Sequence, residues 1–175
     1  LVIQLENRDG SILIDDDTGT GEGDALSTQF RDLDNIEGIA TGRDDGLWNG
    51  YSGTGYMDMG GNVGDAFEFS VDAPEAGTYS FTFRYVNAGG DQQDRPMTLS
   101  VAGTEAATIP FAVTGTGPTG WTTWTDITVE VDLAAGQNTI RMENTIANGP
   151  NIDQVTVASV GPVIDNSADE DGNLA

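Results

Sequence analysis

The side chains of this sequence that could do chemistry are carboxylates, amides and aromatic rings. Its 175 residues include neither Cys nor His, so it lacks a disulfide framework, a thiol nucleophile and the usual general base. The chemistry that remains is that of oxygen atoms. Carboxylate and carbonyl oxygens suit two kinds of site, a hard cation such as Ca²⁺ or a pair of acids acting on a glycosidic bond.

The opening segment, residues 1–7, supplies the first candidate cation ligands. It reads as a strand in which Ile3 and Leu5 lie on one face, while Gln4 and Glu6 lie on the other. Two oxygen-bearing side chains on one strand face can converge on a single hard cation. A solvated strand face is the alternative, and this segment taken alone favours it.

The acidic run from Asp15 to Asp24 does not fit the helix–loop–helix calcium motif. That motif needs Gly at its sixth position and Glu at its twelfth, whereas counting from Asp15 gives Thr20 and Leu26. We interpret the run as a solvated loop and expect residues 9–48 to be mostly irregular. Four apolar residues spaced by three could mark a helical turn instead: Phe30, Leu33, Ile36 and Ile39.

The glycine-rich stretch Asn49–Phe69 is the one that the rest of the chain is expected to support. Its glycines permit positive φ angles and close approach of a ligand to the backbone. Tyr51 and Tyr56 supply rings that can pack inward or form an exposed flat platform. From Ala66 onward, apolar and polar residues alternate as in a strand. Many β-sandwiches build binding sites from a rigid strand with such a loop at its end.

The elements that must position these residues are short strands separated by turn signals. This pattern, with almost no helical period, predicts an all-β protein, an antiparallel β-sandwich. We expect one domain, residues 1–164, followed by an acidic linker or disordered tail at 165–175, as in a module cut from a longer protein. The clearest alternation places four aromatic residues in the core: Tyr79, Phe81, Phe83 and Tyr85.

The charge of the chain limits its partners. Its formal net charge is −23, with only six Lys plus Arg, so nucleic acid and an anionic membrane surface would both be repelled. No apolar run is long enough to span a bilayer. No signal peptide is visible, so we expect a mature fragment or a chain that never had one.

Three segments carry a resemblance to a known family. The first is GYSGTGYMDM followed by GDAFEFSVDAPEAGTYSFTFRY, the second is TGWTTWTDITVEVDLAAGQNTIRME, and the third is GPNIDQVTV. In order and spacing they resemble the carbohydrate-binding modules of families six and thirty-five, over about residues 51–157. Gln4-Leu5-Glu6 lies where those modules usually have an acidic tripeptide. Residues 9–48 look longer and more acidic than in the family.

The resemblance implies a non-catalytic β-jelly-roll that tethers a glycoside-degrading enzyme to polysaccharide. It therefore implies a secreted bacterial protein with a covalently linked catalytic domain. It also implies a structural Ca²⁺ between the first and last strands, with Gln4, Glu6 and Asp153 as side-chain ligands. Backbone carbonyls would complete the six to eight oxygens that calcium takes. The alternative for Asp153 is an Asx-type hydrogen bond that closes its own loop.

The resemblance further implies a sugar site in the loops at one end of the sandwich. Trp124 matches the ring that stacks on the sugar, and Tyr51 matches the aromatic residue of the glycine-rich loop. Asn151, and also Asn148, matches the amide that binds sugar hydroxyls. The apolar C–H face of a pyranose packs on a flat ring, while its hydroxyls need donors and acceptors, and an Asn side chain offers both.

The other aromatic residues have alternative interpretations. Trp124 could be a core residue, since large aromatic side chains near a strand start are usually buried. Trp48 could supply a third wall of the same cleft. We expect Trp121 to be a packing or rim residue and Tyr56 to be core.

Two other function classes remain open. A small glycan hydrolase or lyase would need paired carboxylates, for which Asp58, Asp65 and Glu68 are candidates, although the last two also read as solvent-facing turn and strand positions. An adhesive structural domain would lack affinity for soluble glycans. Because the chain is so acidic, we expect a neutral polysaccharide, either xylan or a galactan such as agarose.

Overall fold

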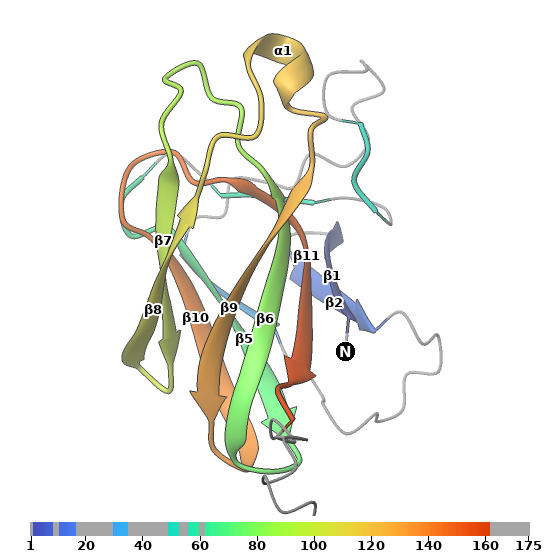
Figure 1. The fold of residues 1–175 in the computed structure, drawn as a ribbon, viewed down its shortest axis with the longest axis vertical. Helices are drawn as coiled ribbons and strands as arrows, with labels where there is room; N and C mark the ends of the chain where they lie inside the picture. Colours follow the sequence, from blue (N-terminus) through green and yellow to red (C-terminus); the bar gives the residue numbers. More distant parts are fainter. Residues whose placement is uncertain are drawn as a thin grey trace, which may run out of the picture.

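The computed structural model describes residues 2–8, 11–16, 30–34, 49–52, 56–59 and 62–161. The described chain forms two antiparallel β-sheets packed face to face (Figure 1). This confirms the predicted all-β sandwich. The described part contains a single short helix, α1 (Gly117–Gly120), between two strands. The predicted tail, residues 165–175, and the domain boundary at 164 lie outside the described residues.

The first sheet has the strand order β2-β1-β11-β6-β9, and β4 also pairs with β11. The second has the order β3-β5-β10-β7-β8. The strands of the first sheet are β1 (Val2–Arg8), β2 (Ser11–Asp16), β4 (Met57–Asp58), β6 (Gly77–Val86), β9 (Thr125–Leu133) and β11 (Asn151–Ser159). Those of the second are β3 (Phe30–Asp34), β5 (Ala66–Ala73), β7 (Arg95–Val101), β8 (Thr104–Phe111) and β10 (Gly136–Asn144).

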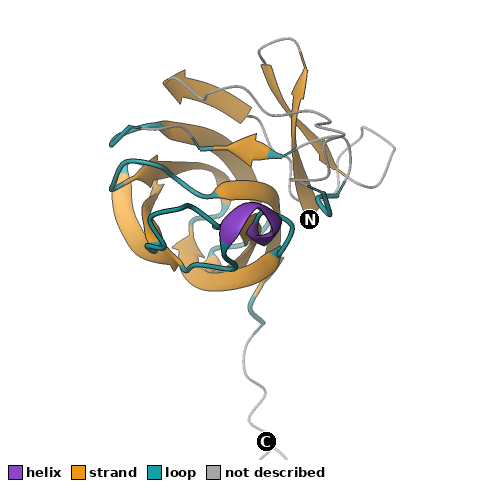
Figure 2. Cartoon of the chain, turned by 90° about the horizontal axis from the view of Figure 1, so that it is seen from above, coloured by secondary structure: helices purple, strands orange, loops and turns teal. Residues whose placement is uncertain are grey.

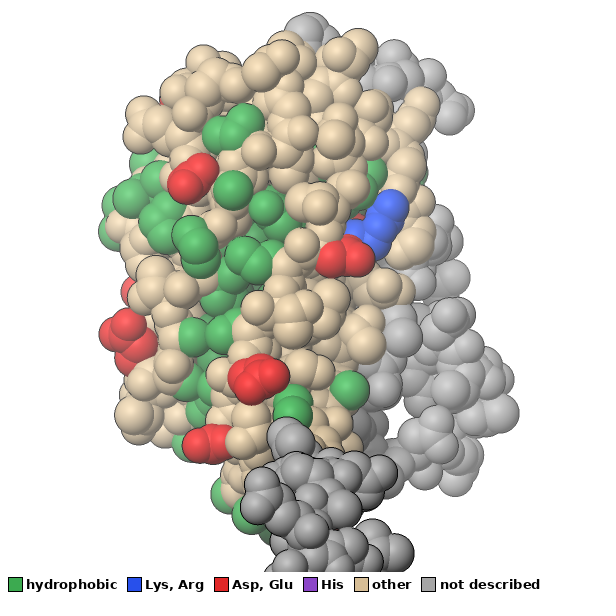
Figure 3. All heavy atoms as spheres, in the orientation of Figure 1, with side chains coloured by type: hydrophobic (Ala, Val, Ile, Leu, Met, Phe, Trp, Pro, Cys, Tyr) green, Lys and Arg blue, Asp and Glu red, His purple; other side chains and the backbone are tan. Residues whose placement is uncertain are grey.

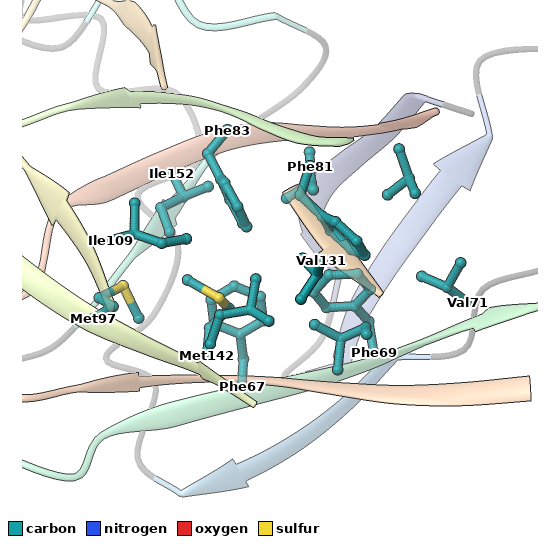
Figure 4. Close-up of a cluster of buried hydrophobic side chains, with 14 of the residues drawn as sticks. Phe67, Phe69, Val71, Phe81, Phe83, Met97, Ile109, Val131, Met142 and Ile152 are labelled. Carbon is teal, nitrogen blue, oxygen red and sulfur yellow. The ribbon is translucent and has the colours of Figure 1, made fainter. Parts of the chain in front are cut away.

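The core lies between the two sheets and is rich in aromatic side chains. The inward-facing residues of β6 include the four predicted aromatics, each at most 4% exposed, so this prediction is confirmed. Burying a large apolar side chain contributes roughly 1.5–3 kcal/mol, and these residues therefore make the sandwich stable without disulfides. Figure 4 shows how the two inner faces interdigitate, with the labelled residues Phe67, Phe69, Val71, Phe81, Phe83, Met97, Ile109, Val131, Met142 and Ile152.

The long connections gather at one end of the sandwich. The last residues of β6, β8 and β10 lie at the same end of the sandwich as the first residues of β7, β9 and β11. The three connections, residues 87–94, 112–124 and 145–150, therefore lie together, with α1 at their centre when seen from above (Figure 2). The opposite end has tight turns, such as Ala102–Gly103 with φ angles of 49° and 79°, as expected from the sequence.

Residues 9–48 contain two strands, so the expectation of a mostly irregular segment is wrong for β2 and β3. Phe30 begins a strand that pairs with β5, not a helical turn. The register of β3 shifts between Asp32 and Asp34. A β-bulge of this kind interrupts the period of two, which hides an edge strand from periodicity.

Candidate functional site

The segments that carry the predicted site residues meet at the start of β11. There Asn151 lies opposite Asp58 of β4 on one side and opposite Val86 of β6 on the other. Further along, Gln4 of β1 lies opposite Gln154. The first strand, the end of the glycine-rich stretch and the closing strand are therefore neighbours, although they are far apart in the sequence.

Three aromatic rings form a continuous group at this place. The ring centroids of Tyr51 and Tyr56 are 5.3 Å apart, and those of Tyr56 and Trp124 are 5.4 Å apart in an edge-to-face contact. Tyr56 is buried, as expected, and it lies between the other two rings. Tyr51 and Trp124 are only half-buried, and neither belongs to the cluster of core residues among the described side chains.

The orientation of Trp124 is fixed by the backbone of the glycine-rich stretch. Its Nε1 donates a hydrogen bond of 3.0 Å to the carbonyl oxygen of Asn49. Gly50 has a φ of 95°, and a Cβ atom there would lie 3.2 Å from Cδ1 of Trp124. Position 50 therefore needs glycine for both its backbone angle and its contact with the indole.

Arg84 is a member of this site that the sequence did not indicate. Its guanidinium lies 5.4 Å from the Trp124 ring centroid, and its Nη2 donates to the Gly50 carbonyl oxygen at 2.7 Å. Its Nη1 forms an ion pair with Oδ2 of Asp153. The Arg84 side chain is 30% exposed, so a cation with a fully buried counter-ion stands at the edge of the aromatic group.

Asp153 is fully buried and tied to the glycine-rich stretch. Both carboxylate oxygens accept from the backbone N–H of Ser52 at 3.0 Å, and Oδ2 also accepts from its hydroxyl at 3.0 Å. Burial raises the pKa of the Asp153 carboxyl, and the bonds from Ser52 and Arg84 offset this only in part. The alternative of an Asx-type bond within its own loop is not what the described hydrogen bonds show, because they come from a segment about a hundred residues away.

Of the three side chains expected to bind calcium, only that of Asp153 lies among the described residues. β1, which carries the other two expected ligands, runs beside β11. The side chains of Gln4 and Glu6, the other expected ligands, lie outside the described residues. Among the described side chains, no three acidic residues form a group that could hold a metal by themselves.

The two candidate amides differ in environment. Asn151 is 1% exposed, and within the described part of the chain neither its Nδ2 nor its Oδ1 has a hydrogen-bond partner. A buried amide in this state is unfavourable unless a ligand or water satisfies it. Asn148 is exposed, with a φ of 64°, on the loop that leads into β11. Trp48, the proposed third wall, lies outside the described residues.

The acids that a hydrolase or lyase would need have structural partners. Asp65 accepts from the backbone N–H of Asn62 at 2.9 Å and so closes a turn. Glu68 lies 3.6 Å from Arg141, which also pairs with Glu143 at 2.8 Å. The side chain of Asp58 lies outside the described residues.

Within the described chain, no helix is long and apolar enough to cross a bilayer.

The face of the molecule in Figure 3 carries few charged side chains among the described residues. Figure 3 shows separated carboxylates over the face of β6, β9 and β11, and one basic patch beside an acidic one. A strip of hydrophobic side chains follows β8 and β9, where Ala107, Ile127 and Val129 pack against the core and stay partly exposed. The visible charges are spread out and do not form a continuous anionic face.

Comparison with known proteins identifies the family. The model of the carbohydrate binding module (family 6) matches residues 41–159. The chain belongs to this family. The solved structure of a family 35 carbohydrate binding module from Clostridium thermocellum is 30% identical, with a TM-score of 0.60, over 75% of this chain and 92% of that module. The module is therefore a carbohydrate-binding jelly-roll.

Other relatives connect the module to enzymes and to one ligand. It is 38% identical to an exo-beta-D-glucosaminidase of Amycolatopsis orientalis over 81% of this chain, and 31% identical to endo-1,4-beta-xylanase B of Cellvibrio japonicus over 62%. It spans only 13% and 18% of those proteins. A structure of Xyl-CBM35 in complex with a glucuronic acid containing disaccharide is 30% identical, with a TM-score of 0.57, over 63% of this chain and 78% of that one.

Proposed function

We propose that the module binds a neutral polysaccharide, xylan or a galactan such as agarose, and holds an attached secreted glycoside-degrading enzyme on it. Trp124 and Tyr51 supply the stacking surfaces, and Asn151 supplies the amide that binds sugar hydroxyls. Trp48 completes the candidate contacts around the rings. Asn148, exposed on the loop that leads into β11, is the candidate for a contact further along the glycan. The module itself is non-catalytic.

The observation that carries this proposal is the state of Asn151. Its amide is buried with its donors and its acceptor unpaired among the described residues, beside a group of rings of which two are half-buried. A sugar hydroxyl both donates and accepts, so it satisfies such an amide. The apolar face of the same sugar covers ring surface that is otherwise in contact with water.

The charge of the site supports a neutral ligand. Among the described side chains, Arg84 is the cation in contact with the Trp124 ring, and its charge is already balanced by Asp153. The whole chain is strongly acidic, which disfavours the approach of a polyanion. The second candidate is a sugar that carries a uronic acid, because Arg84 is partly exposed and a relative is complexed with a glucuronic acid containing disaccharide.

We also propose that one Ca²⁺ stabilises the module, held by Asp153 with Gln4 and Glu6. Its support is the neighbouring position of β1 and β11 and the full burial of the Asp153 carboxylate. An ion held in this way links the first strand to the last and stabilises the native state alone.

The test is a binding screen on immobilised glycans, followed by calorimetry. Xylan, agarose, polygalacturonate and glucuronic acid are the probes. Binding to xylan or agarose that exceeds binding to the two acidic probes is the expected result. Preference for the acidic probes favours the second candidate. Absence of binding to all four, with a cooperative melt of the protein, contradicts the proposed function.

A further inference from the structure

A pair formed by a tryptophan and an arginine lies at the same end of the sandwich as the three rings described above. It consists of Trp121, which follows α1, and Arg95, which begins β7. The guanidinium carbon lies 5.6 Å from the Trp121 ring centroid, and the ring is half-buried. In Figure 2, α1 and the loops around it cover this end of the molecule.

Arg95 links three loops at this end. It is 8% exposed, and its Nη1 donates to the Gly149 carbonyl oxygen at 2.8 Å. Its Nη2 lies 3.6 Å from the Asp91 carboxylate. A Cβ atom on Gly89 would lie 1.9 Å from Nη2, so the backbone passes directly against the guanidinium. Arg95 therefore holds the Trp121 ring and the 145–150 loop in fixed relation.

Buried polarity at this place is incompletely satisfied. Nε of Arg95 is buried and has no hydrogen-bond partner within the described residues. Burying a charged group with an unused donor is unfavourable. Groups of this kind that persist in a native structure are expected where a ligand or ordered water completes them.

The loop that carries Trp121 is closely packed. A Cβ atom on Gly115 would lie 2.7 Å from the Cα of Gly120, and one on Gly120 would lie 2.8 Å from the Cβ of Ala88. The same loop is bonded to the 87–94 loop by Thr114, whose N–H donates to the Asn87 carbonyl oxygen at 2.8 Å. A ring held in place before binding loses little conformational entropy when a ligand stacks on it.

An exposed amide stands beside this group. Asn148 immediately precedes Gly149, whose carbonyl oxygen accepts a hydrogen bond from Arg95. The φ of Asn148 is 64°, in the left-handed region. Its side chain is free to meet solvent, unlike that of Asn151. A flat ring, a fixed cation behind it and an exposed amide are the parts that recognise a pyranose unit.

We propose that Trp121 and Asn148, positioned by Arg95, form a second sugar subsite that binds another unit of the same polysaccharide chain. Trp121 contacts the C–H face of the sugar, and Asn148 binds its hydroxyls. Arg95 is a positioning residue. The proposal rests on the proposed function, because it extends the site of Trp124 and Tyr51 along the glycan.

The test is calorimetry with xylo-oligosaccharides and neoagaro-oligosaccharides of increasing length. In the wild type, affinity rises with length until both subsites are filled. Trp121→Ala removes this rise and weakens binding of the longest oligosaccharide about tenfold or more, while binding of the shortest is kept. Asn148→Gly, which tolerates the positive φ, acts in the same direction. Thr123→Ala, an exposed change in the same loop, leaves binding unchanged.

The outcomes separate this proposal from the proposed function. Unchanged binding in both Trp121→Ala and Asn148→Gly, with loss of binding in Trp124→Ala, overturns the second subsite and leaves the proposed function in place. Equal weakening at every length in Trp121→Ala also overturns it, because Trp121 then shares one subsite with Trp124. Absence of binding in the wild type overturns the proposed function and this proposal with it. If Trp121→Ala does not melt cooperatively, Asn148→Gly decides.

Discussion

Replacing Trp124 by Ala separates a sugar platform from a core residue. In the structure the indole is half-buried and makes three named contacts, with the carbonyl of Asn49, the ring of Tyr56 and the guanidinium of Arg84. It lies outside the core cluster of the described side chains. We therefore expect its removal to weaken polysaccharide binding strongly and to lower stability only moderately.

The magnitudes follow from those contacts. A hydrogen bond, an edge-to-face ring pair and an exposed cation–π contact together contribute on the order of 2–3 kcal/mol, and water entering the open site recovers part of this. For a chain of this length, that corresponds to a fall in melting temperature of roughly 10 °C or less. Loss of stacking on the sugar should cost on the order of 1–3 kcal/mol, by analogy with bases on aromatic rings, or about 5-fold to 150-fold in affinity.

The assay measures melting temperature and glycan binding on the same preparations. Phe83→Ala is the matched core control, because truncating a buried Phe typically costs about 3–5 kcal/mol and leaves the binding surface unchanged. Trp124→Tyr keeps a ring and should retain part of the binding. Trp124→Ala that binds as tightly as the wild type refutes the platform. A melt as low as that of Phe83→Ala shows that Trp124 is structural.

The remaining predictions concern the amide, the glycine and the metal. Asn151→Ala should abolish binding with an unchanged or higher melting temperature, since no hydrogen bond is lost within the described structure. The control Asn138→Ala removes three hydrogen bonds at the opposite end and should lower the melting temperature without affecting binding. The reverse pattern, with binding measured by calorimetry, would contradict this. Gly50→Ala should weaken binding because its Cβ would displace Trp124. The control Gly64→Ala has a similar φ of 89° but no atom within 4 Å of the added Cβ, so it should lower stability by a comparable amount and leave binding unchanged. Equal affinities of the two variants would argue against the contact between residue 50 and Trp124. Chelation should lower the melting temperature, since an ion at a hundredfold excess over its Kd adds roughly 2.7 kcal/mol to the free energy of unfolding. Asp153→Ala should have a low melting temperature that chelator no longer changes. A wild-type melting temperature unaffected by chelator would contradict the calcium proposal.

The architecture could be predicted because most strands alternate clearly. In β6 and β5 every second residue is aromatic or aliphatic and buried, and a one-residue shift in register would turn all of these side chains outward. The pattern therefore specifies both the strand and its face. In the turn at Ala102–Gly103, Gly103 is a residue type that accepts a positive φ, whereas the φ of 49° at Ala102 does not follow from its residue type.

The two strands that were missed carried weaker signals. β1 and β2 form a hairpin in which Arg8 pairs with Ser11. The intervening Asp9-Gly10 is the kind of pair favoured in two-residue hairpin connections, so β2 could have been predicted from the sequence. β3 could not, because its bulge breaks the alternation and edge position relaxes the demand for apolar residues on both faces.

The part of the site that lay beyond prediction is the pair of Arg84 and Asp153. The two residues are 69 positions apart, and they meet because β6 and β11 pair with a register shift between Ile152 and Gln154. With 29 acidic residues and six basic ones in the chain, no rule of spacing selects Asp153 as the partner of Arg84. The three tryptophans were ranked through the resemblance to the family, in which Trp124 matches the stacking ring. The ion pair depends on the register of two distant strands, and its role beside Trp124 emerges only when that register is known.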